Sequence, residues 1–257
     1  GSPAEASTQS KVTVIDTQTQ TAIGEIAFPG LLGYAVADEN DDIYVAVTDR
    51  NEVYRFDAQT VAAQMRPQPE AGAIAVDNTV SSKAKKEAAA WTVLDWTGTI
   101  HSPNPADGRL RSFNLSPECA DPRSLAIDSI HLRVFAACNN RRLVVLNTGT
   151  GEKVTSLPIG PDVDAVGYDA EHGLIFTANG GAEGSLTIIH QDVTDTYAVI
   201  QTLPTRQRAS TLAVDPQSGA VYLVTDYQGV DLSHPGGIGT LHQEPVKGSF
   251  QVLQISD

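Results

Sequence analysis

The sequence predicts an all-β protein, a β-propeller of four-stranded antiparallel blades, with about five to six blades in this chain. The first observation is a repeat in which a short apolar run ends in aspartate and a second β-rich run soon follows. Four repeats are complete, and a fifth opens alike and then diverges; their aspartates are Asp38, Asp77, Asp128, Asp169 and Asp215. Successive aspartates lie 39, 51, 41 and 46 residues apart, close to the ~40–50-residue period of propeller blades.

The second observation is that each repeat continues in the same order. In the clearest repeat, residues 124–127 form the first strand and residues 133–137 the second. Residues 143–147 form the third strand, and residues 153–159 the fourth. The third strands end in Asp/Asn-x-x-Thr, as at 57–60 and 147–150, and an Asp or Asn side chain there favours a turn. A sandwich or a barrel, the competing all-β folds, does not require this regular period.

Composition favours one domain over residues 11–257, because 41% of the 257 residues are hydrophobic and only 19% are charged. Residues 1–10 are small and polar and are expected to be disordered or tag-like. The formal net charge is −14, which disfavours nucleic acid and anionic membrane as partners. No apolar stretch is long enough to cross a bilayer, so membrane insertion is not expected.

Two segments depart from the repeat, near 78–108 and 229–248. In the first, residues 82–90 are rich in helix formers, so a short helix or a mobile excursion is expected. The second is expected to be a long loop that covers the channel mouth. The expected strands number about 21, whereas five four-stranded blades need 20 and six need 24. Either a fragment of a larger propeller or an unusual closure is therefore expected.

The two cysteines flank one repeat, since Cys119 precedes its first strand and Cys138 follows its second. Antiparallel pairing would place Arg123 roughly opposite Cys138 and bring Cys119 within a loop's reach. A disulfide is expected, with two separate buried thiols as the alternative. The bridge would indicate an oxidising compartment, and thus a periplasmic or extracellular location.

The chain resembles the YVTN/YncE-like β-propeller repeat family, which is typically secreted or periplasmic in bacteria. The resemblance is carried by residues 118–128, 157–169, 206–215 and 248–253. It implies a propeller of about seven blades, so that roughly two and a half blades would be absent before Lys11. It also supports the cysteine pairing, and it brings no catalytic motif.

The candidate site is one rim of the propeller, where the loops before each first strand and the loops between second and third strands meet. Such a convergence of polar groups is the default location of a ligand site. The alternative is that these charged residues pair between adjacent blades and hold the ring together. The predicted ligand-binding residues are Arg123, Asp162, Asp164, Asn179, Arg206 and Arg208, with Asp49, Asn51, Asn139, Asn140, Arg141, Asp226 and Tyr227 on the same rim.

No motif announces a reaction. The six histidines lack the spacing of a zinc site, and there is no Gly-x-Ser-x-Gly elbow. We therefore expect no metal, no cofactor and no catalytic residue. The leading hypothesis is a secreted or periplasmic binding protein that holds a small polar ligand or a protein partner at the rim. The alternatives are a lactonase-like hydrolase or isomerase acting on a sugar lactone, with Asp162, Asp164, Arg206 and Arg208 as its acid and base candidates, and a docking subunit for a redox or metal-carrying partner.

Overall fold

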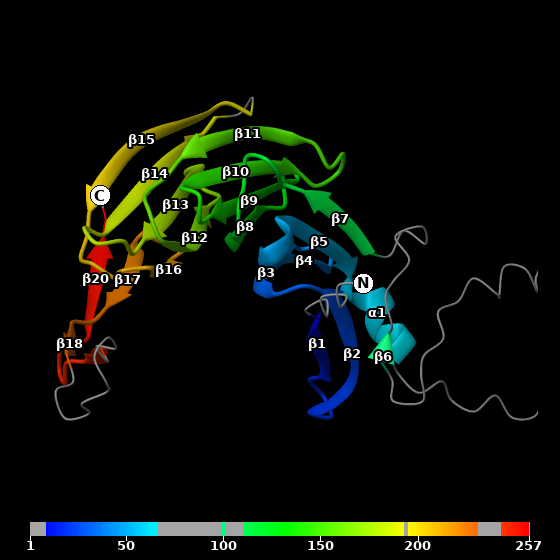
Figure 1. Ribbon diagram of the computed structural model, residues 1–257. Helices are drawn as coiled ribbons and strands as arrows, with labels where there is room; N and C mark the ends of the chain where they lie inside the picture. Colours follow the sequence, from blue (N-terminus) through cyan, green and yellow to red (C-terminus); the bar gives the residue numbers. More distant parts are fainter. Residues whose placement is uncertain (1–8, 66–98, 101–109, 193–194, 231–242, 257) are drawn as a thin grey trace, which may run out of the picture.

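The computed structural model describes residues 9–65, 99–100, 110–192, 195–230 and 243–256. Sheets of mainly antiparallel strands follow one another along a curved row, from a sheet near the N-terminus to one near the C-terminus (Figure 1). Within the described part of the chain, three sheets have four strands each, paired in chain order. Their strands are β3 (Leu32–Ala37), β4 (Asp42–Val47), β5 (Glu52–Asp57) and β7 (Leu110–Asn114); β8 (Pro122–Asp128), β9 (Arg133–Cys138), β10 (Arg142–Asn147) and β11 (Lys153–Pro158); and β12 (Val163–Asp169), β13 (Leu174–Asn179), β14 (Ser185–Gln191) and β15 (Tyr197–Pro204).

The sheets at the two ends of the row are smaller. At one end lie β1 (Gln9–Asp16), β2 (Thr21–Pro29) and β6 (Thr99–Ile100), and at the other lie β16 (Thr211–Val214), β17 (Val221–Thr225) and β20 (Gln251–Ile255). A separate ribbon pairs β18 (Gln228–Val230) with β19 (Gln243–Pro245). The described residues include two helices, η1 (Thr48–Arg50) and α1 (Ala58–Met65). Five blade-like sheets among the described residues agree with the expected number.

The middle sheets are buried on both faces because their central strands are apolar at nearly every position. In β9, Val134 and Ala136 pack into the core toward the preceding sheet, whereas Phe135 and Ala137 pack into the core toward the following one. Successive strand residues point to opposite faces, so one continuous apolar run supplies both interfaces. This is the packing that radially arranged blades require.

The anchoring aspartates are turn residues. The Oδ1 of Asp128 accepts the backbone N–H groups of Ile130 and His131, each at 3.1 Å, and the Oδ1 of Asp169 in the next repeat accepts those of Glu171 and His172. An aspartate that accepts these N–H groups closes the tight hairpin between the first and second strands. The repeat found in the sequence is therefore a repeated turn.

The Asp/Asn-x-x-Thr motif has two outcomes. At 147–150 the Oδ1 of Asn147 accepts from the backbone of Gly149 and Thr150, as expected of a turn. At 57–60 the expected turn is wrong, because helix α1 starts at Ala58. The Oδ1 of Asp57 accepts the backbone N–H of Thr60 at 2.5 Å. The same side-chain chemistry caps a helix as readily as it closes a turn.

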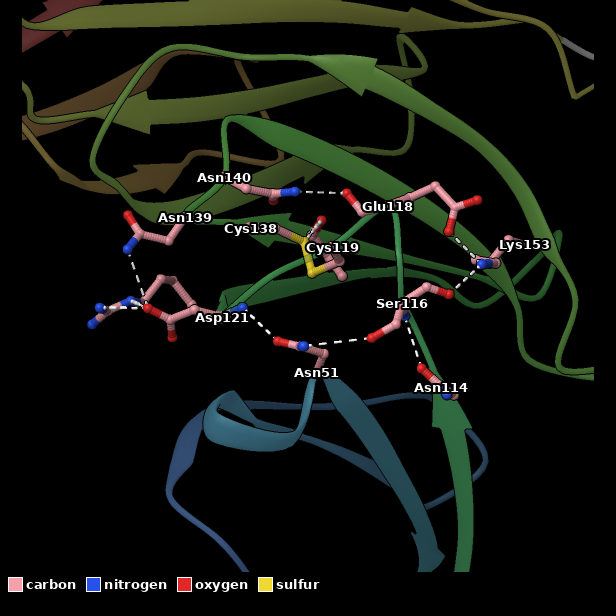
Figure 2. Close-up of a disulfide and its surroundings, with 12 residues drawn as sticks. Asn51, Asn114, Ser116, Glu118, Cys119, Asp121, Cys138, Asn139, Asn140 and Lys153 are labelled. Carbon is pink, nitrogen blue, oxygen red and sulfur yellow. Dashed lines mark hydrogen bonds and ion pairs between the residues drawn. A yellow bond between two sulfur atoms is a disulfide. The ribbon is translucent and has the colours of Figure 1, made fainter.

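The disulfide joins Cys119 to Cys138, with 5.4 Å between the Cα atoms (Figure 2). It ties the loop before β8 to the end of β9. The partner of Cys138 across the strand pair is Pro122 rather than Arg123, because the register shifts between Pro122 and Ser124. Asn51 lies beside this loop, where its Oδ1 accepts the backbone N–H of Asp121 at 2.7 Å and links two neighbouring sheets.

The predicted insertions are only partly described. Residues 73–77 and the expected helix at 82–90 lie outside the described residues. After them, β7 pairs with β5 and completes the sheet that β3 began, while Thr99 of β6 pairs in parallel with Glu25. Residues 231–242 of the second insertion also lie outside the described residues. Strand β1 begins at Gln9, within the segment expected to be disordered.

Candidate functional site

A cavity of about 700 Å³ opens between the β12–β15 sheet and the C-terminal sheet. We call it the rim cavity. Its volume falls within the roughly 300–1,000 Å³ typical of small-molecule sites. Loops before β12 and β16 and loops after β13 and β17 form its wall, as expected of one propeller rim. It is lined by Asp162, Gly180, Gly181, Ala182, Thr205, Arg206, Gln207, Arg208, Thr225, Asp226, Tyr227 and Gln228.

Backbone hydrogen bonds fix the loops of the rim cavity. The N–H of Gly180 donates to the carbonyl of Asp162 at 2.8 Å, and the carbonyl of Gly180 accepts the N–H of Arg208 at 3.0 Å. Gly184 permits a close approach of the next loop, since a Cβ there would lie 2.1 Å from the carbonyl oxygen of Arg206. The charged side chains of the cavity therefore belong to loops that are hydrogen-bonded to one another across two adjacent sheets.

Arg206 is an exposed cation held by an aromatic ring. Its guanidinium carbon lies 5.4 Å from the ring centroid of Tyr227, and it also donates a hydrogen bond to the Tyr227 hydroxyl. A cation over a ring face at this distance gains electrostatic attraction from the ring. Because a guanidinium carries five N–H donors, several remain for a ligand.

Arg208 faces an aspartate of its own repeat. Its Nε lies 3.5 Å from Oδ1 of Asp226, whose other oxygen accepts the side-chain amide of Gln228 at 2.8 Å. Both carboxylate oxygens of Asp226 therefore have a partner. The backbone of Arg208 has φ of +65°, in the left-handed region that L-residues other than Asn, Asp and Gly rarely adopt.

Asp162 is exposed, and its carboxylate has no hydrogen-bond or ion-pair partner among the described residues. Asp121 holds the equivalent position in the preceding repeat, seven residues before the anchoring aspartate, and there Arg123 binds it at 2.7 Å. The residue two positions after Asp162 is Asp164, which cannot provide that guanidinium. This substitution within the repeat leaves the carboxylate of Asp162 unpaired.

The predicted site residues separate into three places. Asp162, Arg206 and Arg208 meet in the rim cavity. Arg123 and Asp164 line a different cavity of about 770 Å³, bounded also by Leu31, Tyr34 and Thr211 at the starts of the innermost strands.

Asn179 lines neither cavity. It is fully buried, and its amide donates to the oxygens of Thr177, Ser185 and Thr187. It thereby holds β13 to β14, so its position in the fold is explained by structure alone.

The alternative explanation of the rim charges was that they form ion pairs between adjacent blades. Arg123 and Arg208 do not form such pairs. Each of them pairs with an aspartate of its own repeat. Among the described residues, ion pairing between adjacent sheets occurs elsewhere, where Arg133 donates to Asp195 at 2.5 Å.

Several lining residues were not in the predicted set, namely Gly180 to Ala182, Thr205, Gln207, Thr225 and Gln228. Their loops follow from the repeat, but no residue type marked them. Within the described part of the chain, no three His, Cys, Asp or Glu side chains gather as metal ligands. The same part contains no helix with the length and apolar character to span a membrane.

Comparisons with known proteins support the fold. No protein-family model and no curated protein matches the sequence. Among solved structures, one match is Kuenenia stuttgartiensis hydrazine synthase, with a TM-score of 0.58 and 14% identity over 96% of this chain. The fold is a β-propeller. The match spans 60% of the hydrazine synthase chain, and at this identity it shows the fold alone.

Proposed function

We propose that this protein is a binding protein that holds a small polar ligand in the rim cavity. The observation that carries the proposal is the combination of a cavity of ligand size with Asp162 and Arg206, two charged groups whose bonding capacity is not filled. Charged side chains with free donors and acceptors on a rigid wall are what a polar ligand requires. The resemblance to YVTN/YncE-like propellers remains a prediction.

The hydroxyl groups of the cavity argue against an enzyme that attacks its substrate through a serine- or threonine-type nucleophile. Thr225 donates to the carbonyl of Gln207 at 2.7 Å, and Thr205 donates to the carbonyl of Arg206 at 3.4 Å. An activated nucleophile instead donates to a side-chain base. Among the described lining residues, no hydroxyl has such a base as its acceptor. The lactonase-like alternative, with Asp162, Asp164, Arg206 and Arg208 as its acid and base candidates, stays a prediction.

The disulfide supports an extracytoplasmic location, periplasmic or extracellular, because such bonds persist in oxidising compartments. Thiol alkylation under denaturing conditions, before and after reduction, tests this on protein taken from its native host. Two reactive thiols without prior reduction would contradict the location.

Binding is tested by thermal shift and isothermal titration calorimetry against sugars, sugar acids, amino acids and nucleotides. A ligand at one hundred times its Kd raises the free energy of unfolding by about 2.7 kcal/mol. We expect stabilisation of the wild type and loss of it in Arg206→Gln. Arg142→Gln, which removes an exposed arginine outside the cavity, is the matched control. Stabilisation that survives in Arg206→Gln, or the absence of any stabilising compound, would refute the proposal.

A further inference from the structure

The rim cavity presents one unfilled group of each charge sign. Asp162 comes from the loop before β12, and Arg206 comes from the loop before β16 in the adjacent sheet. No ion pair joins these two described side chains, although both line the same cavity. The remaining lining charges, Arg208 and Asp226, face each other at 3.5 Å. The wall is thus close to neutral and offers a cation and an anion separately.

A free carboxylate selects a cationic donor over a neutral one. A hydrogen bond in which one partner is ionised is roughly twice as strong as one between neutral groups, and a cationic donor adds direct attraction between opposite charges. The same argument makes a carboxylate the preferred partner of Arg206, whose planar N–H groups match it geometrically. Tyr227 holds that guanidinium against its ring, which reduces the side-chain entropy that binding would cost.

The second arginine, Arg208, stands at a repeat position whose backbone is left-handed. Asp121, Asp162 and Arg208 occupy equivalent positions in three repeats, and all three have positive φ, of +55°, +53° and +65°. Aspartate tolerates this conformation, whereas a long side chain seldom adopts it. Leu132 and Arg141 also have positive φ and lie outside the rim cavity, so this conformation places the Arg208 side chain without assigning it a role. Arg208 adds positive charge beside Arg206 on one side of the cavity.

We propose that the ligand is a small zwitterion of the amino-acid class, whose carboxylate is bound by Arg206 and whose ammonium group is bound by Asp162. The inference rests on the proposed function, since it names the ligand class of the same cavity. A neutral sugar would hydrogen-bond to these side chains but would neutralise neither charge. A simple acid or a simple amine would pair only one of them.

The test is isothermal titration calorimetry of the full chain with each of the twenty standard L-amino acids. Every amino acid that binds is compared with its amide, which lacks the carboxylate charge, and its N-acetyl derivative, which lacks the ammonium charge. We expect each derivative to bind at least about tenfold more weakly, the loss expected from one charge-assisted hydrogen bond.

Two variants locate the charges. Asp162→Asn preserves a side chain that tolerates positive φ while removing the negative charge, so it should abolish the preference for the amino acid over its N-acetyl derivative. Arg206→Gln should abolish the preference over the amide. Asp164→Asn is the matched control for Asp162, because it removes an exposed carboxylate of the same repeat that lines the other cavity. It should retain both preferences.

The outcomes separate this inference from the proposed function. If neutral sugars or simple acids bind and no amino acid does, the zwitterion is refuted while a polar-ligand site stands. If an amino acid binds equally well to wild type and Asp162→Asn, the assignment of its ammonium group is refuted. If no compound of any class binds, both proposals fail.

Discussion

Replacement of Asp128 by alanine tests how the blades are joined. Its side chain is 1% exposed. Besides the turn N–H groups, the carboxylate accepts the side-chain amide of Gln191 at 2.8 Å and the hydroxyl of Tyr168 at 3.3 Å, both from the next sheet. It also contacts Nδ1 of His131 at 2.7 Å. Asp128 therefore closes its own turn and bonds the adjacent blade at once.

The size of the stability loss follows from the donors that Asp128→Ala leaves without an acceptor. The turn N–H groups near Ile130 can bond to water, whereas the amide of Gln191 cannot, because that residue is buried. A buried polar group left without a partner costs about 1–3 kcal/mol. Loss of the turn acceptor adds about 1 kcal/mol, by analogy with helix caps. We expect Asp128→Ala to lower the free energy of unfolding by about 3 kcal/mol.

Asp169→Ala is the internal control. Asp169 closes the equivalent turn, and His172 lies 2.7 Å from it, but no described side chain of the next sheet donates to its carboxylate. Urea denaturation should therefore show Asp128→Ala to be less stable than Asp169→Ala by about 2 kcal/mol. Equal losses within experimental error would refute the reasoning, because the bonds between blades would then contribute nothing.

The same residue sets a pH dependence. Burial alone raises the pKa of Asp128, but hydrogen bonds from His131 and Gln191 outweigh it, and the pKa is lowered. A lowered native pKa adds stability above the ordinary value of about 4, and this stability is lost as the pH falls through the native pKa. The difference between wild type and Asp128→Ala should therefore be largest near neutral pH and shrink below about pH 4. A difference that grows on acidification would contradict this sign.

Three further predictions concern other parts of the fold. Replacing Cys119 and Cys138 together by serine should lower the free energy of unfolding by about 3 kcal/mol in urea titrations, because the bridge spans 19 residues; a smaller loss than 1 kcal/mol would contradict it. Arg208→Asn should raise the free energy of unfolding by about 0.5–1 kcal/mol, since asparagine tolerates positive φ. The same substitution should weaken ligand binding in calorimetry. Stabilisation without weaker binding would argue against a role of Arg208 in binding the ligand. In thermal unfolding, Gly184→Ala should lower the free energy of unfolding by at least about 2 kcal/mol more than Gly248→Ala does. A Cβ at Gly184 would meet backbone at 2.1 Å, whereas one at Gly248 would meet nothing within 4 Å. Equal losses would show that the loop around Gly184 shifts to accommodate the methyl group.

Much of the fold was predictable because it is encoded locally. The anchoring aspartates and the apolar runs beside them specify hairpins, and hairpins of one period specify blades. The bridge between Cys119 and Cys138 followed from their places at the two ends of one hairpin. The pairing of β7 with β5 was not predictable, because residues 66–109 separate β7 from α1 and no local pattern joins them.

The candidate site was predictable only as a rim. Which rim residues share a cavity depends on their distance from the propeller axis, and that distance is set only when the blades assemble. Arg123 and Asp164 lie at the starts of inner strands and line the second cavity, whereas Asp162 and Arg206 lie between sheets. Asn179 ends its strand with its amide turned inward, so a polar residue at a strand end became part of the core.

By itself, the sequence determined that the chain forms repeated antiparallel hairpins, because apolar runs and turn chemistry act between residues a few positions apart. Only the tertiary structure decided which charges meet and which stay unpaired. Arg208 found Asp226 within its own repeat, while Asp162 and Arg206, from adjacent sheets, stayed separate across one cavity. The physical reason is that charge pairing requires side chains to approach within a few ångströms, and the stacking of blades sets those distances.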